Sequence, residues 1–172
     1  MTRDRDPAGR PRNARPRDAL GRPLDHDAPE IGTEAGQARI PDDLVIDGTD
    51  AATLADRLLR EGRPFHAHEV LEAAWKSGPP GERDLWQGLA QIAVGLTHAR
   101  RGNARGAVTL LRRGAERVRA DQERAERAAR SHPYGLDIPA VLAASDDLAA
   151  RIERHGLDGI PPADLSVRLL PP

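Results

Sequence analysis

The chain has 172 residues and a formal net charge of −1, which allows one domain with a tail. With so little net charge, nothing draws the whole chain to nucleic acid or to an anionic membrane surface. It contains no cysteine, which excludes disulfides, thiolate metal ligands and a cysteine nucleophile. The start of the chain has no apolar core of the kind a secretory signal needs, so we expect a cytoplasmic protein.

Residues 1–43 alternate arginine and aspartate, punctuated by proline and glycine. Such a segment buries too little apolar surface to offset the entropy of ordering, so we predict a disordered tail that is dispensable for folding. Its acidic residues roughly balance its arginines. That balance favours a solvated tail over a basic arm that binds nucleic acid.

From Thr49 onward the apolar residues follow the period of a helix, broken at Gly62, at Gly78, at residues 101–103 and at residues 131–135. A Thr/Asp cap opens the first helix, and Asp137 caps the last one, which Gly156 ends. No run alternates with the period of a strand. We therefore predict an all-α fold, a compact bundle of about five helices in antiparallel hairpins, over residues 44–156. The proline-rich residues 157–172 are predicted to form a C-terminal tail.

The third predicted helix, residues 82–101, is expected to be the buried centre of the bundle. Residues 85–99 carry no fixed charge, yet they are too few and too polar to span a membrane. Gly88 and Gly95 lie seven residues apart, which predicts close approach of a neighbouring helix on that side. A separate, purely apolar face is formed by Leu85, Leu89, Ile92 and Leu96.

Polar residues interrupt the apolar faces of the second and third helices. On the second helix His68 falls beside Trp75, and Glu72 follows His68 by one turn. The short turn after the second helix makes it an antiparallel neighbour of the third, which places Glu72 near Gln87 and His68 near Gln91. The candidate polar site therefore comprises His68, Glu72, Trp75, Gln87, Gln91 and His98.

Three interpretations of this site remain open. The side chains could form a buried hydrogen-bond network that fixes helix register, a carboxylate–histidine acid/base pair, or part of a metal site. The "HEVLE" stretch lacks the second histidine of a His-Glu-x-x-His motif, and His98 lies about two turns beyond Gln91. We therefore predict no metal and no cofactor, and assign no catalytic residue.

Arginine is in excess over residues 100–130, but these arginines form i,i+4 pairs with acidic residues and no aromatic residues interleave to stack bases. A solvated helix face explains this stretch better than nucleic-acid binding does.

The stretches "FHAHEVLEAAW" and "WQGLAQIAVGLTHARRGNARGAVTLLRRG" resemble the DUF309 family of small bacterial and plastid proteins, which has no assigned biochemical function. The resemblance covers about residues 54–120 and implies a compact all-α fold with one central helix wrapped by the others. The matching positions are Phe65, His68, Glu69, Glu72, Trp75, Gln87, Gly88, Gln91, His98, Gly102, Asn103, Gly106, Ala107, Leu110, Leu111 and Gly114.

We therefore expect a helical interaction or ligand-binding module, with a protein or small-molecule partner, that carries this polar site between its second and third helices. A second copy of the chain is one candidate partner, and a membrane is not expected. The alternative is a small enzyme, a hydrolase or a metal-dependent one, that uses His68 and Glu72 as acid/base groups or metal ligands. Whether these side chains are open to solvent or sealed between the helices separates the two functions.

Overall fold

A computed structural model of the chain describes residues 18, 20–22, 40–41, 44–130 and 134–172. In these residues it contains the α-helices α1 (Gly48–Arg60), α2 (Pro64–Ser77), α3 (Arg83–Arg100), α4 (Ala104–Arg127) and α5 (Ile138–His155). Two short 3-10 helices, η1 (Pro80–Glu82) and η2 (Pro162–Asp164), and no strand accompany them in the described part. The predicted all-α fold is confirmed. Most of the predicted N-terminal tail lies outside the described residues.

Side-chain caps fix where three of these helices begin. Asp47 caps α1 by accepting hydrogen bonds from the backbone amides of Thr49 and Asp50, at 2.9 and 3.0 Å. This helix therefore begins two residues before the predicted Thr/Asp start, since the capping carboxylate lies further upstream. Asn103 caps α4, and Asp137 caps α5 as the sequence predicts.

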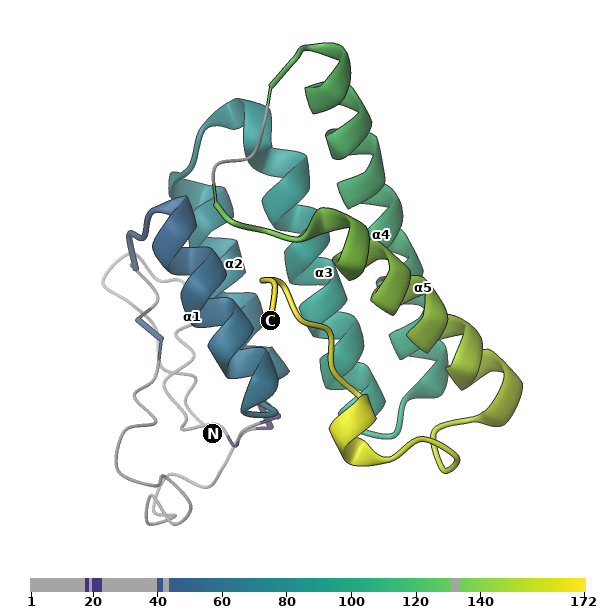
Figure 1. The fold of residues 1–172 in the computed structure, drawn as a ribbon. Coiled ribbons are helices and arrows are strands. Elements are labelled where there is room, and N and C mark those ends of the chain that lie inside the picture. The colour runs from purple at the N-terminus through teal and green to yellow at the C-terminus, as the bar shows by residue number, and fades with distance from the viewer. Residues whose placement is uncertain (1–17, 19, 23–39, 42–43, 131–133) are drawn as a thin grey trace, which may run out of the picture.

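The helices form two layers (Figure 1). The consecutive hairpins place α2, α3 and α4 side by side, with α3 in the middle. On the near side of Figure 1, α1 covers α2 and α5 covers α4, and the C-terminal segment (residues 157–172) runs between α1 and α5. The central position predicted for the third helix is confirmed.

Three glycines let α3 and α4 approach closely. A β-carbon added at Gly88 would lie 2.6 Å from a methyl carbon of Val118 and 2.9 Å from the backbone oxygen of Gly114. One added at Gly95 would lie 3.0 Å from the backbone nitrogen of Leu111. These distances leave no room for a side chain, so the close approach predicted from the glycine spacing is confirmed.

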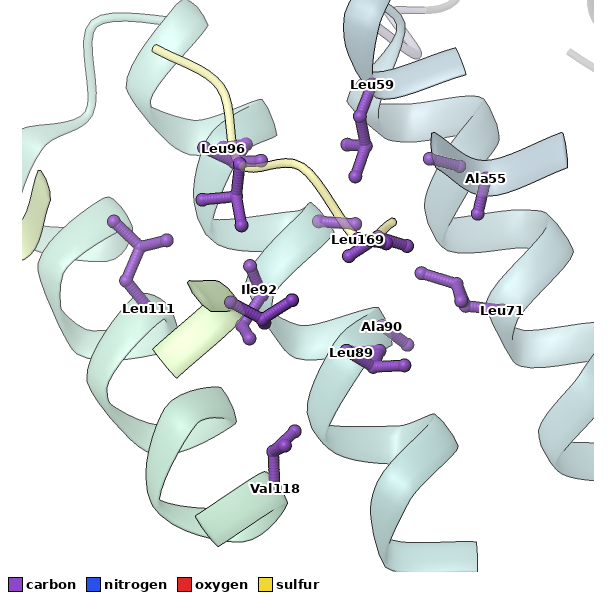
Figure 2. Packing of buried hydrophobic residues seen from close by; sticks show 14 of the residues in the cluster. Ala55, Leu59, Leu71, Leu89, Ala90, Ile92, Leu96, Leu111, Val118 and Leu169 are labelled. Atoms are coloured by element: carbon purple, nitrogen blue, oxygen red, sulfur yellow. The ribbon is translucent and has the colours of Figure 1, made fainter. Parts of the chain in front are cut away.

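The core lies between the two layers, and the predicted apolar face of α3 is wholly buried. In Figure 2 the side chain of Leu169 lies between Leu59 and Leu71 on one side and Leu89 on the other. Its backbone amide donates to Asp56 Oδ1 at 2.8 Å, and its carbonyl accepts from the amide of Asp137. The C-terminal segment is thus part of the core, which its proline-rich composition did not predict.

Candidate functional site

Apart from Arg100 at its end, α3 reaches the surface on one side, and that side carries the predicted polar residues. Gln87, Gln91, Val94 and His98 are all partly exposed. At 100° per residue, Gln91 lies about 160° around the helix from Leu89, which faces the core. These residues therefore lie on the side of the α2–α3–α4 layer opposite α1, α5 and the C-terminal segment. We call this side the outer face.

The second helix contributes a short charged row to the outer face. His68 Nε2 lies 3.6 Å from Glu72 Oε2, and Lys76 Nζ lies 2.9 Å from Glu72 Oε1. The His68 side chain is 26% exposed and that of Glu72 is 34% exposed. The row is therefore neither sealed between the helices nor fully solvated.

Burial lowers the pKa of His68 below its ordinary value, because the charged imidazolium loses water there. The Glu72 carboxylate opposes this effect and Lys76 adds to it. The buried Nδ1 atom makes no hydrogen bond of regular geometry, although the nearby backbone of Phe65 also favours the charged form and so raises the pKa. The imidazole is thus held towards its neutral form, with one nitrogen turned inward.

The two glutamines of α3 have different surroundings. Gln87 Oε1 accepts a hydrogen bond from Arg117 Nη1 of α4, and the same guanidinium nitrogen lies 3.1 Å from Asp84 Oδ1. Gln91 Oε1 is buried and accepts no hydrogen bond from the described part of the chain. An acceptor without a donor is therefore held at the middle of the outer face.

The predicted pairing of Glu72 with Gln87 and of His68 with Gln91 is not seen as hydrogen bonds in the described residues. Arg117 binds Gln87 because an arginine on the other neighbouring helix reaches further than a glutamate and adds charge to the hydrogen bond. The sequence argument considered the α2–α3 hairpin alone, so it did not include a donor from α4.

His98 belongs to the turn between α3 and α4. Its Nδ1 atom lies 2.8 Å from the side-chain nitrogen of Asn103, whose carbonyl oxygen caps α4. A β-carbon at Gly106 would come within 2.7 Å of both side chains, so glycine there makes room for this contact. The structure does not link His98 to His68 or Glu72.

Two aromatic residues border the polar row on α2. Trp75 is partly buried against the core, and the ring of Phe65 lies 6.0 Å from that of His68 between centroids. Phe65 was not in the candidate set, although its spacing of three residues from His68 could have placed it on the same face. Lys76, four residues after Glu72, could have been found by the same spacing, whereas nothing local points to Arg117.

No group of three or more histidine, aspartate or glutamate side chains in the described ranges is arranged to hold a metal ion. His68 and Glu72 come together as predicted, but only as a pair.

Part of this three-helix layer is similar to a known family of proteins. Residues 54–110 match the family model described as "Domain of unknown function (DUF309)". These residues carry α2, α3 and most of the polar face, and the resemblance seen in the sequence is confirmed over them.

The chain is also similar to "Uncharacterized protein YpuF" of Bacillus subtilis (strain 168), with 38% identity over 75 residues. The match covers 43% of this chain and 43% of the relative, so the chain spans less than half of the relative's length. No solved structure matches the chain. Within its described residues, no helix has the length and apolarity that crossing a membrane requires.

Proposed function

We propose that this chain is an interaction module that binds a partner on the outer face of the α2–α3–α4 layer. The observation that carries the proposal is the buried Oε1 atom of Gln91, which no donor in the described residues satisfies. Withdrawing a polar atom from water without a partner costs roughly 1–3 kcal/mol. The Gln91 side chain as a whole is partly exposed, so a rotation can bring Oε1 to a donor of a bound partner, and the hydrogen bond formed there recovers this energy.

The chemistry of the face indicates what kind of partner fits. Glu72 and Gln91 offer hydrogen-bond acceptors, and Trp75 and Phe65 flank them with aromatic surface. Acceptors beside aromatic rings suit a cationic donor such as an arginine or lysine side chain of another protein. Arg117 already makes one such contact with Gln87 from within the chain, which supports this choice.

Replacing Gln91 with leucine tests the proposal without any partner. The change removes the unsatisfied acceptor and keeps a similar volume, so the free energy of unfolding should rise by about 1 kcal/mol in a denaturant titration. Gln122→Leu is the matched control, because Gln122 lies on α4 and its amide already donates to Glu126 at 2.8 Å. That variant should be neutral or slightly less stable. Destabilisation by Gln91→Leu would show that the glutamine is structural and would remove the basis of the proposal.

The binding itself is tested by NMR titration with a helical peptide carrying arginine at every fourth position. Shifts are expected at the side-chain amide of Gln91 and at the imidazole of His68, and Gln91→Leu should weaken the binding. The same peptide with glutamate in place of arginine should give no shifts. Equal shifts with both peptides, or none with either, would contradict the proposed partner chemistry.

Two expectations from the sequence stay predictions. A cytoplasmic location is one, and self-association with a second copy of the chain is the other. The small-enzyme alternative is not proposed, since nothing in the described part of the chain favours it over binding.

A further inference from the structure

A short piece of the N-terminal region forms a tight turn against the domain. Asp18 Oδ1 accepts hydrogen bonds from the backbone amides of Leu20 and Arg22, at 2.9 and 2.8 Å. The amide of Gly21 donates to the backbone oxygen of Asp18 at 2.8 Å. The amide of Asp18 donates to the backbone oxygen of Arg22 at 3.0 Å. We call Asp18 and residues 20–22 the latch.

Two contacts attach the latch to one end of the α2–α3 pair. The guanidinium of Arg101, just beyond α3, donates from both Nε and Nη2 to the carbonyl of Leu20. Gly21 is buried against Phe65, the second residue of α2. Its φ of +73° favours glycine, and a β-carbon would lie 2.3 Å from the Phe65 ring, so only glycine fits this contact.

The charged side chains around the docked latch favour its position. The carboxylate of Asp18 lies close enough to His66 to raise its pKa and so favour its charged form, while burial and Arg63 lower that pKa. Asp18 therefore brings a negative charge to a place that also carries Arg101 and Arg63, whose Nη1 atom lies 3.7 Å from Glu61 Oε2. Opposite charges at an interface select the orientation in which the turn docks.

The latch and the outer face share Phe65. One part of its ring meets Gly21, and its centroid lies 6.0 Å from that of His68. A partner that packs on Phe65 therefore has to displace the latch first. Since the latch belongs to the same chain, its local concentration at Phe65 far exceeds that of a free peptide, so a few contacts suffice to hold it.

We propose that the latch is an intramolecular ligand of Phe65 and Arg101 that competes with the partner of the outer face. The competition rests on the proposed function, whereas the docking of the latch does not. A partner then binds with an apparent dissociation constant equal to the intrinsic one divided by the fraction of chains that are unlatched.

Two full-length variants separate the latch from its receptor. Gly21→Ala disrupts the latch and leaves Phe65 and Arg101 intact, whereas Arg101→Ala removes a receptor residue. Gly135→Ala controls for strain at positive φ, because Gly135 has a φ of +68° and, among the described residues, its β-carbon would meet only Leu170, at 3.9 Å. Arg105→Ala controls for loss of an exposed arginine nearby.

Amide hydrogen exchange and NMR report the docking. In the wild-type chain the amides of Leu20 and Arg22 should be protected, and both latch variants should lose that protection while both controls keep it. A synthetic peptide of residues 14–26 should then shift the Phe65 and His66 signals of Gly21→Ala, but not those of Arg101→Ala and only weakly those of the wild type. Unprotected latch amides in the wild type, or equal peptide shifts in all three chains, would overturn the latch.

The competition has its own readout. The arginine peptide of the outer-face assay should bind Gly21→Ala more tightly than wild type, with Gly135→Ala unchanged. Equal affinity for both would show that the latch does not compete. The arginine peptide could bind no variant although the latch amides are protected and the latch peptide binds in trans. In that case the proposed partner is wrong and competition with it is excluded. The docking of the latch on Phe65 and Arg101 would still hold.

Discussion

At the scale of single residues, buried polar groups divide into those that hold the fold and those that the fold leaves unsatisfied. Asp56 is 2% exposed, and its carboxylate accepts two backbone amides of the C-terminal segment as well as the Arg60 side chain. Gln91 Oε1 and His66 Nδ1 are buried too, but neither has a hydrogen bond within the described residues. The first kind stabilises the native state, while the second lowers its stability and marks places where binding or protonation changes the energy.

His66 gives a prediction about pH. Burial, with Arg63 beside it, lowers the pKa of His66 from 6.5 to about 4. Between these values the unfolded chain binds a proton that the folded chain does not, so stability should fall as the pH falls from about 6.5 to about 4. The whole effect is at most about 3 kcal/mol.

Replacing His66 with glutamine should flatten this part of the profile in urea titrations from pH 7 to pH 4. Stability at pH 7 should change less than stability at pH 4, because the histidine is neutral at pH 7 in both states. A variant profile as steep as the wild-type one would show that other groups cause the acid loss.

At the scale of the elements, α3 packs against its neighbours in two different ways, through glycines on one side and through large side chains on the other. Towards α4 it has glycines, so the two backbones meet almost directly. Towards α1, α2 and the C-terminal segment it has large side chains, with Trp86 and Leu89 each 1% exposed. The glycine contact fixes the α3–α4 spacing, which in turn lets Arg117 reach Gln87 across the outer face.

Alanine at Gly88 or Gly114 should therefore destabilise the bundle. At both positions the new β-carbon would lie under 3.0 Å from backbone oxygen of the facing helix, which cannot move without separating the helices. We expect a loss of about 1–3 kcal/mol in the free energy of unfolding for each variant, measured in urea. Helix propensity alone predicts the opposite sign, a gain of about 1 kcal/mol, so the sign decides between the two explanations.

Gly81→Ala serves as the control for these variants. Within the part of the chain that the structure describes, its β-carbon would meet only the Arg130 side chain, at 3.5 Å, so little change in stability is expected.

At the scale of the whole molecule, the C-terminal segment joins the two layers. Val167 and Leu169 are each 1% exposed in the core, and Asp137, at the start of α5, donates its amide to the Leu169 carbonyl. Arg100, at the end of α3, donates to the carbonyl of Pro162. The segment therefore links α1, α3 and α5, which lie far apart in the sequence.

Deleting residues 165–172 should greatly weaken the cooperative fold. Each buried leucine or valine contributes about 1.5–3 kcal/mol, and a domain has only about 5–15 kcal/mol of net stability. We expect a broad, low-temperature melt by circular dichroism. Deleting residues 1–22, whose described residues form the latch and are not part of the hydrophobic core cluster, should shift the melting temperature little. A reversed order of these two effects would contradict the assignment of the core.

The sequence by itself determined the helices and the choice of the central one. The 3.6-residue period, the glycine breaks and the Asp137 cap are local signals, and they predicted α2, α3 and α5 close to their observed bounds. Gly88 and Gly95 even predicted a close contact, because a glycine inside a helix has few other uses.

Only the tertiary structure decided which side chains meet. The sequence predicted that Gln87 contacts Glu72 across the α2–α3 hairpin. In the structure Gln87 instead accepts a hydrogen bond from Arg117 of α4. Likewise, residues 157–172 have the composition of a tail, yet Asp56 binds their backbone and the gap between α1 and α5 buries their leucines. A helix period follows from backbone geometry within a few residues, whereas a hydrogen-bond partner or a filled gap depends on where distant elements come to lie.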